Sequence, residues 1–426
     1  MSFFKPETLN FERTNFEPNY INMKENIFEL TTEQLKAIAK NLQTKIETGL
    51  EKDQTEIAGL PTYIAPKAGI ENGKALVLDW GGTNFRAAIV EFFKDKSPEV
   101  TESVSIKLSA TETKGFKQKE DLFAAMSGAI KTLKKLDKNI KNIGYCFSYP
   151  AESTLDGDAI LLYWTKGIEI PDMVGKLVGK PFMNYLNDNI DNVNFEKIVV
   201  LNDTVACLFG GLSKSGYDTY LGLIVGTGTN MASLMQADKI KKLNTAYKGD
   251  TLPVNLESGN FRPPYLIDID DVVDACSNNK GKQRFEKAIS GMYLGEIFQT
   301  MFPYNEFEPK FDGGKLNAIV NYPDIYKEIY VDAARSIFAR SAYLVAASLA
   351  GLVFVLKAHD PDLKKICLAA EGSLFWSKDK KGKDYVQMVI QELNLLLVEE
   401  GYSDVSVDIC EVKDANLIGS AVAALS

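Results

Sequence analysis

The sequence predicts an α/β protein. Short apolar runs typical of strands alternate with longer runs typical of helices along most of the 426 residues. Two strand-turn-strand units carry the same Gly-Thr-Asn in their turns, at 82–84 and 228–230, which suggests two duplicated halves. Because no low-complexity linker or block of charge separates the halves, we expect any second domain to form by the chain crossing back and forth.

The first half begins with a helix and continues with strands. Thr31 and Gln34 form a capping box that opens a helix expected to reach Leu50. Strands are expected at 75–80, 85–93, 100–108, 143–147 and 198–201, with a helix at 121–133. The last of these strands leads into Asn202-Asp203-Thr204, whose side chains can cap a helix at 205–212.

The second half repeats the pattern. Strands are expected at 221–225, 231–235, 366–370 and 406–410, and helices at 337–356, at 385–399 and after Asp414. The longest uncharged run, 341–356, is shorter than the roughly 20 residues that span a bilayer, so it predicts a buried helix. Lys5 and Glu7 stand where a signal peptide would be apolar, so we expect a cytoplasmic protein without membrane insertion.

Charge and rare residues exclude several classes of function. The 48 basic and 57 acidic side chains leave a net charge of −9, which repels nucleic acid and anionic membranes. The chain has five widely spaced cysteines and one histidine, His359. This pattern argues against a structural zinc site, a disulfide framework, and Ser-His-Asp or Cys-His catalysis. Acid-base chemistry must therefore use carboxylates or lysine.

Three turns at strand ends are rich in glycine and hydroxyl groups, at 81–84, 226–229 and 371–373. Glycine lets a ligand approach backbone N–H groups and threonine adds a hydroxyl donor, as a polyphosphate requires. A single turn of this kind is as readily explained by hairpin geometry, but three together favour phosphate binding. The spacing of neither the P-loop nor the dinucleotide fingerprint is present, so a different phosphate cradle is implied.

Several longer motifs resemble the hexokinase family. They are Leu-Asp-Trp-Gly-Gly-Thr-Asn-Phe-Arg at 78–86, Tyr-Trp-Thr-Lys-Gly at 163–167, Leu-Asn-Asp-Thr-Val at 201–205 and Gly-Thr-Gly-Thr-Asn at 226–230. Segments 143–150, 255–259, 285–296 and 340–342 add to the resemblance, which runs from about residue 60 to the end. The length suits one hexokinase unit.

The resemblance implies an actin-like (ribonuclease H-like) fold of two lobes, each a mixed five-stranded sheet flanked by helices. The expected small lobe comprises 72–204 and 414–426, and the large lobe 1–71 and 205–413. The implied reaction is phosphorylation of a hexose, glucose first, at the 6-hydroxyl by MgATP, for glycolysis. The alternatives are a catalytically weak, hexokinase-like sugar sensor and a kinase preferring another hexose. Monomer and homodimer are both open.

The resemblance also assigns the sugar side of the site. It makes Asp203 the general base that takes the proton of the attacking hydroxyl, and Lys166 a second catalytic group. Without the other motifs, an N-cap would be the simpler reading of Asn202-Asp203. The sugar would be held by Ser148, Thr165, Lys166, Asn202, Asp203, Asn230, Glu257 and Glu286.

The nucleotide side follows in the same way. Its expected residues are Asp79, Gly81, Gly82, Thr83, Asn84, Arg86, Thr227, Gly228, Thr229, Gly372 and Ser373. Asp79 would approach Mg²⁺ through water, since this ion retains much of its hydration shell. Segment 414–419 departs from the Asp-Gly-Ser-Gly type of segment usual in the family, which bears on nucleotide preference, and Ser258 stands where tryptophan is usual.

Overall fold

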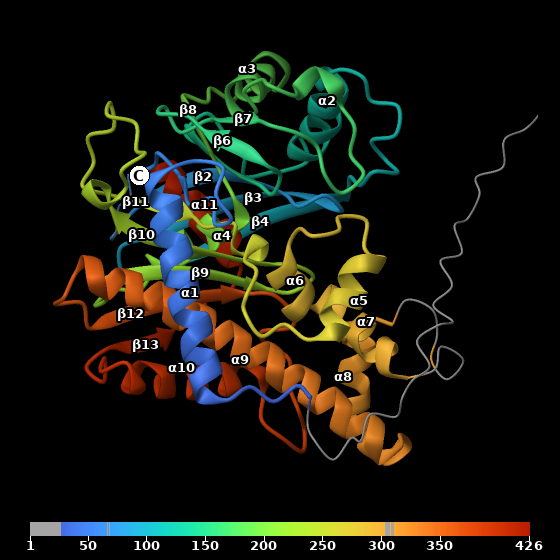
Figure 1. The fold of residues 1–426 in the computed structure, drawn as a ribbon. Coiled ribbons are helices and arrows are strands. Elements are labelled where there is room, and N and C mark those ends of the chain that lie inside the picture. Colours follow the sequence, from blue (N-terminus) through green and yellow to red (C-terminus); the bar gives the residue numbers. More distant parts are fainter. Residues whose placement is uncertain (1–26, 66, 68, 303–306, 308–310) are drawn as a thin grey trace, which may run out of the picture.

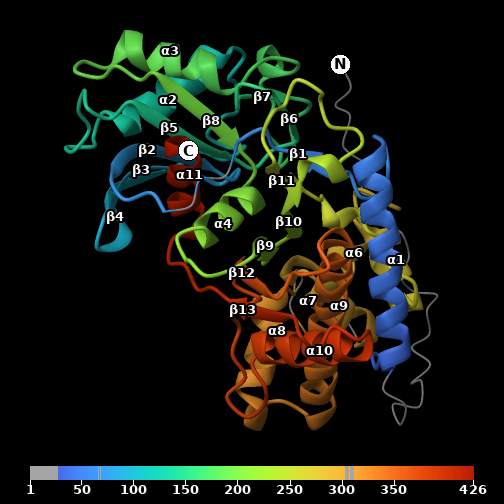
Figure 2. The same cartoon turned by 90° about the vertical axis from the view of Figure 1, so that its left-hand side faces the viewer.

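Two sheets flanked by helices form two lobes (Figures 1 and 2). This computed structural model describes residues 27–426 except 66, 68, 303–306 and 308–310. The sheet of the first lobe lies beneath α2 (Lys119–Ile130) and α3 (Gly179–Asn189), and the sheet of the second lobe lies above the long helix α9 (Glu328–His359).

The first sheet has the strand order β4-β3-β2-β5-β8. Its strands are β2 (Gly73–Trp80), β3 (Asn84–Phe93), β4 (Lys96–Lys107), β5 (Asn142–Phe147) and β8 (Lys197–Leu201). Strands β2 and β3 form an antiparallel hairpin, while β2 pairs with β5, and β5 with β8, in parallel. The central strands are apolar on both faces because helices cover both, which explains their continuous hydrophobic runs.

The second sheet has the order β1-β11-β10-β9-β12-β13. Its strands are β1 (Leu60–Pro61), β9 (Thr219–Val225), β10 (Thr229–Gln236), β11 (Thr251–Asn255), β12 (Lys365–Glu371) and β13 (Ser406–Ile409). From β11 to β13 it repeats the first sheet: an antiparallel hairpin whose first strand pairs in parallel with a later strand. The duplication inferred from the two turns is therefore confirmed in the topology, and β1 adds a short edge strand to the five expected.

The remaining elements cover these sheets. A two-stranded ribbon consists of β6 (Ala151–Ser153) and β7 (Ala159–Leu161). The other helices are α1 (Thr32–Glu51), α4 (Asp203–Gly211), α5 (Asp268–Cys276), α6 (Arg284–Ile289), α7 (Gly291–Met301), α8 (Gly313–Asn321), α10 (Tyr385–Glu399) and α11 (Ala415–Leu425). The capping box of Thr31 and Gln34 forms as expected at the start of α1.

Helices α4 and α11 pack against each other between the two sheets (Figure 2). Helix α11 lies on β2 and β5, and α4 lies on β9 and β12. The approach is close because glycine stands at the contact: a Cβ on Gly419 would lie 1.7 Å from the carbonyl oxygen of Ala206. The same holds at Gly144, where a Cβ would lie 2.1 Å from the carbonyl oxygen of Ser420.

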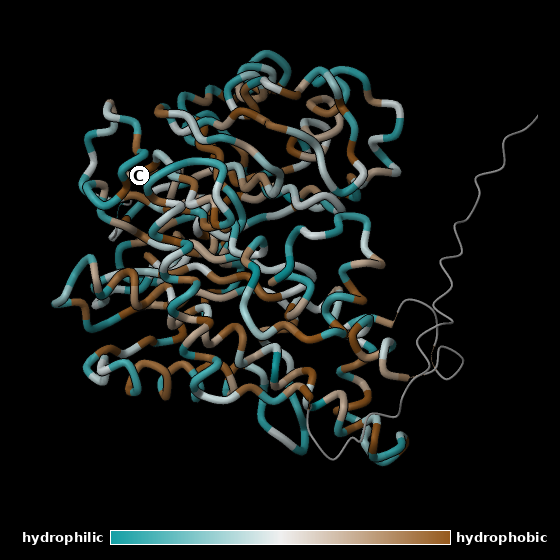
Figure 3. Tube along the Cα trace, in the orientation of Figure 1, coloured by the Kyte–Doolittle hydropathy of each residue, from teal (hydrophilic) through white to brown (hydrophobic). Residues whose placement is uncertain are grey.

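Helix α9 contains the apolar run that the sequence assigns to a buried helix. It is long and apolar enough to cross a membrane, but 83% of its most apolar window is buried inside the protein. It packs against α1 and α10, in the lower lobe where apolar residues, brown in Figure 3, are concentrated. The helix begins at Glu328, nine residues before the expected start at Ile337. Asp332 and Arg335 interrupt the apolar run there, although the helical turns continue.

One expectation about the cysteines is wrong. Cys367 and Cys410 form a disulfide, with their Cα atoms 5.8 Å apart. They are 43 residues apart in the sequence, but the parallel register of β12 and β13 places Leu368 opposite Ile409 and so brings the two cysteines together. Cysteine spacing alone carries no information about such a register.

The glycine contact between α4 and α11 predicts a large effect of one added methyl group. Gly419→Ala should lower the free energy of unfolding by at least about 1–3 kcal/mol, because the helices must separate to admit the new Cβ. Gly128→Ala is the matched control, since Gly128 is also helical but has no atom within 4 Å of the added Cβ. Thermal unfolding should show a lower Tm only for the first variant; equal Tm values would contradict the packing.

Candidate active site

The turn between β2 and β3 lies against a lysine from a distant segment. Gly82 has φ of 104°, and a Cβ there would lie 2.6 Å from Cδ of Lys166. The Lys166 Nζ donates to the carbonyl oxygens of Gly81 at 2.9 Å and of Ser148 at 2.8 Å. Three residues predicted from separate motifs are therefore in direct contact, and the exposed lysine is held in place by two backbone groups.

An arginine lies between two carboxylates at the end of the same hairpin. The Arg86 Nη2 is 3.0 Å from Oδ2 of Asp79, and its Nη1 is 3.3 Å from Oδ1 of Asp414. Burial raises the pKa of the Asp79 carboxyl, an effect that the charge of Arg86 opposes. Asp79 and Arg86 are thus together, as predicted, but Arg86 already has two acidic partners.

Asn202 and Asp203 begin α4. Asn202 is the N-cap, and its Oδ1 accepts a hydrogen bond from the Thr204 N–H at 2.9 Å. Oδ1 of Asp203 accepts from the same N–H at 2.8 Å and from the Thr204 hydroxyl at 3.3 Å. The capping function considered for this pair therefore belongs mainly to Asn202, and Asp203 adds a carboxylate at the positive end of the helix.

A chain of hydrogen bonds links polar residues of the large lobe. The Asn230 Nδ2 donates to Oδ1 of Asn255 at 2.8 Å, and the Asn255 Nδ2 donates to Oε1 of Glu257 at 2.7 Å. Asn230 also accepts from the Ser258 N–H at 3.1 Å. Glu257 has the left-handed φ of 54°, so this network holds its side chain on an unusual backbone.

Glu286 connects α6 to the second glycine turn. Its Oε2 accepts from the Thr229 N–H at 3.0 Å, and a Cβ on Gly228 would lie 2.6 Å from the same oxygen. Burial raises the pKa of both Glu286 and Glu257, and the charge of Glu257 raises that of Glu286 further. These two acids are therefore half-buried neighbours and not the solvent-facing side chains that glutamate usually provides.

Electrostatic effects join the two lobes at this point. The charge of Lys166, from the small lobe, lowers the pKa of Glu257 and Glu286 against the effect of burial. The charge of Asp203 acts with burial to raise the pKa of Glu257 and of Glu371. Lys166 and Asp203 are therefore both close enough to Glu257 to influence its charge.

A pocket of about 740 Å³ adjoins the second glycine turn. It is lined by the β9–β10 turn, by the starts of α7 and α8, and by the segment after β12. Of the residues predicted to bind nucleotide, Thr227 and Ser373 line it. Gly372 lies beside it with φ of 115°, where a Cβ would be 2.2 Å from the carbonyl oxygen of Val225.

The two threonines of this turn differ in orientation. Thr229 is buried, and its hydroxyl donates to the carbonyl oxygen of Ile224 at 2.9 Å. Thr227 is exposed and lines the pocket. Thr227 is thus the better placed of the two to give a hydroxyl to a ligand.

Comparisons with known proteins agree with this geometry. Two family models described as hexokinase match residues 21–212, and residues 220–304 with 316–426. The chain belongs to the hexokinase family. It is therefore an enzyme, a hexose kinase from a family that uses ATP as its phosphate donor, with an alcohol group as acceptor.

Individual relatives extend over most of this hexokinase. Hexokinase-2 of Schizosaccharomyces pombe is 29% identical and covers 94% of this chain and 95% of its own length. A glucokinase of Aspergillus niger is 34% identical over 60% of this chain and 58% of its own. Among solved structures, a hexokinase with 24% identity has a TM-score of 0.74, and a Schistosoma mansoni hexokinase complexed with glucose, with 22% identity, has 0.72. Each covers 94% of this chain, and their likeness shows the two-lobed fold.

Three residues of the site were missing from the sequence prediction. Asn255 lies in a quoted motif and is buried between Asn230 and Glu257. Glu371 belongs to the third glycine turn, and its Oε1 accepts from the Asn416 N–H at 3.1 Å. Tyr149 is 4% exposed, and its hydroxyl has no partner among the described residues. All three stand within two residues of a predicted site residue, so their positions in the sequence were a usable signal.

The other predicted residues lie at the same turns without defined side-chain partners in the described structure. Gly81, Thr83 and Asn84 are exposed at the β2–β3 turn, and Thr165 precedes Lys166 in a half-buried position. The described residues contain no group of three or more acids, cysteines and histidines that could hold a metal ion. The prediction of Asp79 as a contact for Mg²⁺ through water concerns this one carboxylate.

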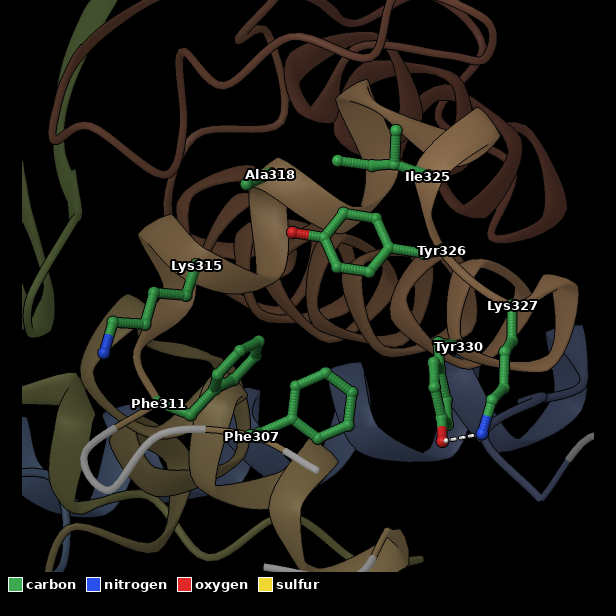
Figure 4. Close-up of a pocket in the computed structure, with 8 residues that line it drawn as sticks. All are labelled: Phe307, Phe311, Lys315, Ala318, Ile325, Tyr326, Lys327 and Tyr330. Atoms are coloured by element: carbon green, nitrogen blue, oxygen red, sulfur yellow. Dashed lines mark hydrogen bonds between the residues drawn. The ribbon is translucent and has the colours of Figure 1, made fainter. Parts of the chain in front are cut away.

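A second pocket, of about 510 Å³, lies elsewhere in the large lobe (Figure 4). Its lining residues are mostly aromatic or aliphatic: Phe307, Phe311, Lys315, Ala318, Ile325, Tyr326, Lys327 and Tyr330. The Lys327 Nζ lies 3.1 Å from the Tyr330 hydroxyl at its edge. None of the predicted site residues lines this pocket.

The raised pKa of the half-buried Glu286 predicts a pH-dependent change in stability. A carboxyl whose pKa is raised on folding favours the native state at low pH, and this contribution is lost as the pH rises through the native pKa. Glu286→Gln removes the ionisable group but keeps an oxygen acceptor for the Thr229 N–H. The variant should therefore gain Tm relative to the unmodified enzyme, and more at pH 8 than at pH 5.

The control for this measurement is Glu152→Gln, since Glu152 is exposed on β6. Its Tm difference from the unmodified enzyme should stay constant between the two pH values. If the Tm difference between Glu286→Gln and the unmodified enzyme were also the same at both pH values, burial would not penalise the charged form of the Glu286 carboxyl.

Proposed function

We propose that this hexokinase transfers the γ-phosphoryl group of MgATP to the 6-hydroxyl of a hexose, with glucose as the first expected acceptor. The observation that carries the proposal is the position of Asp203. Its carboxylate stands at the start of α4 and acts electrostatically on Glu257 of the large lobe, on the same site as Lys166. The proposed base and the cation thus both influence a half-buried acid that is proposed to bind the sugar.

Asp203 is proposed as the general base. Both of its hydrogen bonds to Thr204 use Oδ1, which leaves Oδ2 for the proton of the sugar hydroxyl. Phosphoryl transfer needs mainly in-line positioning and charge neutralisation, so one placed carboxylate is sufficient for the proton. The N–H of Thr204 and the helix dipole hold this carboxylate in orientation.

The sugar is proposed to bind between the lobes. Asn230, Glu257 and Glu286 offer amide and carboxylate groups from the large lobe, and a hexose presents hydroxyls that both donate and accept. Ser148, Thr165, Lys166 and Asn202 would contact it from the small lobe. Because one ligand would bridge both lobes, its binding energy can favour their closure, which limits transfer of the phosphoryl group to water.

The glycine turns suit the phosphate donor. Gly81 has no atom within 4 Å of an added Cβ, so the backbone of the first turn is open to a ligand there. Gly82 and Gly228 instead allow Lys166 and Glu286 to approach the two turns closely. The pocket that begins at Thr227 is large enough for a nucleoside. Bound Mg²⁺ would neutralise phosphate charge during transfer, with Asp79 as the contact through water.

Three further features of the enzyme are proposals on the same basis. The lobe boundaries are placed at 71/72, 204/205 and 413/414. The first precedes β2, the second lies within the first turn of α4, and the third lies just before α11. The enzyme would act in the cytoplasm, as a monomer or a homodimer, on free sugar and nucleotide. The similarity to hexokinases and a glucokinase supports sugar and nucleotide as the substrates at the level of the family.

The general base can be tested with two substitutions at one position. Asp203→Asn keeps the acceptor for the Thr204 N–H but cannot take a proton, so kcat for glucose should fall by about 10²–10⁴. Its Tm and its affinity for glucose should change little. Asp203→Ala should lose the same kcat and, in addition, some stability.

A coupled assay of ADP formation, with and without glucose, measures these effects. Near-normal kcat in Asp203→Asn would leave Asp203 with a structural function only. Absence of turnover of the unmodified enzyme with every hexose tested would refute the proposed reaction itself.

The two threonines of the second turn give a matched pair. Thr227→Val removes an exposed hydroxyl and should raise KM for MgATP about threefold to thirtyfold, equivalent to one lost hydrogen bond, without changing KM for glucose. Thr229→Val removes a bond to the Ile224 carbonyl and should mainly lower Tm. Steady-state kinetics and thermal unfolding of both variants test this, and the reverse pattern would exchange the functions of the two residues.

A further inference from the structure

Arg86 is only partly available to a phosphate. Its guanidinium is bound by Asp79 on one nitrogen and by Asp414 on the other, at 3.0 and 3.3 Å. The side chain is 35% exposed, so solvent and ligands can reach it. The charges of Asp79, Asp414 and Glu371 raise the pKa of Arg86 against the effect of burial, which places a third acid nearby.

The rest of the donor side is also poor in positive charge. The charged residues that line the 740 Å³ pocket are Glu296 and Asp312, and no lysine or arginine is among its described lining residues. Each cation near the β2–β3 turn therefore contributes a large share of the positive charge that can attract the phosphates of the donor. Arg86 and Lys166 are the basic side chains in contact with the predicted phosphate-binding residues of this turn.

Asp414 is held firmly in its position. It has the left-handed φ of 53° and directly precedes α11. Two residues later, the N–H of Asn416 donates to Glu371 at the end of β12. Asp414 matches the aspartate that begins the Asp-Gly-Ser-Gly type of segment, and the departure from that pattern lies in the residues after it, Ala415, Asn416 and Leu417.

We propose that Asp414 competes with the phosphate donor for Arg86 and thereby sets a high KM for the donor. The proposal rests on the proposed function, in which Arg86 contacts phosphate. An arginine with one carboxylate partner keeps a fork of donors for phosphate, whereas two carboxylates offset its charge and occupy both terminal nitrogens. Asp414 therefore acts through Arg86 and need not touch the sugar.

The ion pair is weak enough to be displaced. Arg86 and Asp414 are 35% and 32% exposed, and pairs of this kind contribute little to stability. A doubly charged phosphate can thus take the place of Asp414, but it must do so against the negative charge that remains close by. Asparagine at this position would keep the size and an oxygen acceptor and would remove only the charge.

The test compares Asp414→Asn with a matched control. Asp414→Asn should lower KM for MgATP about threefold to tenfold, without a change in KM for glucose, and added salt should reduce the difference. Asp404→Asn is the control, because Asp404 also forms a 3.3 Å pair with a lysine, Lys357, in another part of the large lobe. It removes the same charge and should leave KM for MgATP unchanged.

A binding measurement separates this proposal from the proposed function. Titration with MgADP needs no turnover, and Asp414→Asn should bind it about threefold to tenfold more tightly. In an Arg86→Gln background the same change should have no effect, since the competition requires the arginine. Equal MgADP affinity of Asp414→Asn and the unmodified enzyme, or weaker binding by the variant, would overturn the proposal. Failure of the unmodified enzyme to phosphorylate any hexose would refute only the proposed function.

Discussion

The contact between α4 and α11 is the constraint on which the rest of the structure depends. The first sheet, α11, α4 and the second sheet are stacked through positions where only glycine fits: Gly144 on Ser420, Gly419 on Ala206 and, at the second sheet, Gly222 on Thr204. Asp203 is the first residue of α4, and Asp414 directly precedes α11. The spacing of the helices therefore determines where the acids of the site stand relative to both glycine turns.

The sequence predicts the parts of the fold that are locally encoded. Strands buried on both faces are continuous apolar runs, and the Thr31 capping box is complete within four residues. The start of α9 is not predictable from an apolar run, since Asp332 is exposed while the backbone remains helical. The Cys367–Cys410 disulfide depends on strand register, which no local pattern contains.

In the site, too, some residues are recognisable from the local sequence and others only from contacts between distant segments. The glycine turns and Asp203 are recognisable because each needs a particular residue type next to a strand end. Glu371 and Asp414 are different, because their importance comes from contacts with Asn416 and Arg86 that link distant segments. Burial and the charges of Asp79 and Asp203 raise the pKa of Glu371, and such costs are accepted where a site has a chemical task.

The anchoring of Lys166 has a consequence for the entropy of ligand binding. A free lysine side chain samples many rotamers, and fixing it costs up to about 2 kcal/mol at 25 °C. In this hexokinase the carbonyl oxygens of Gly81 and Ser148 already fix the ammonium group before any ligand arrives. That ordering cost is met during folding, so under the proposed function sugar and phosphate would meet a charge whose position is set in advance.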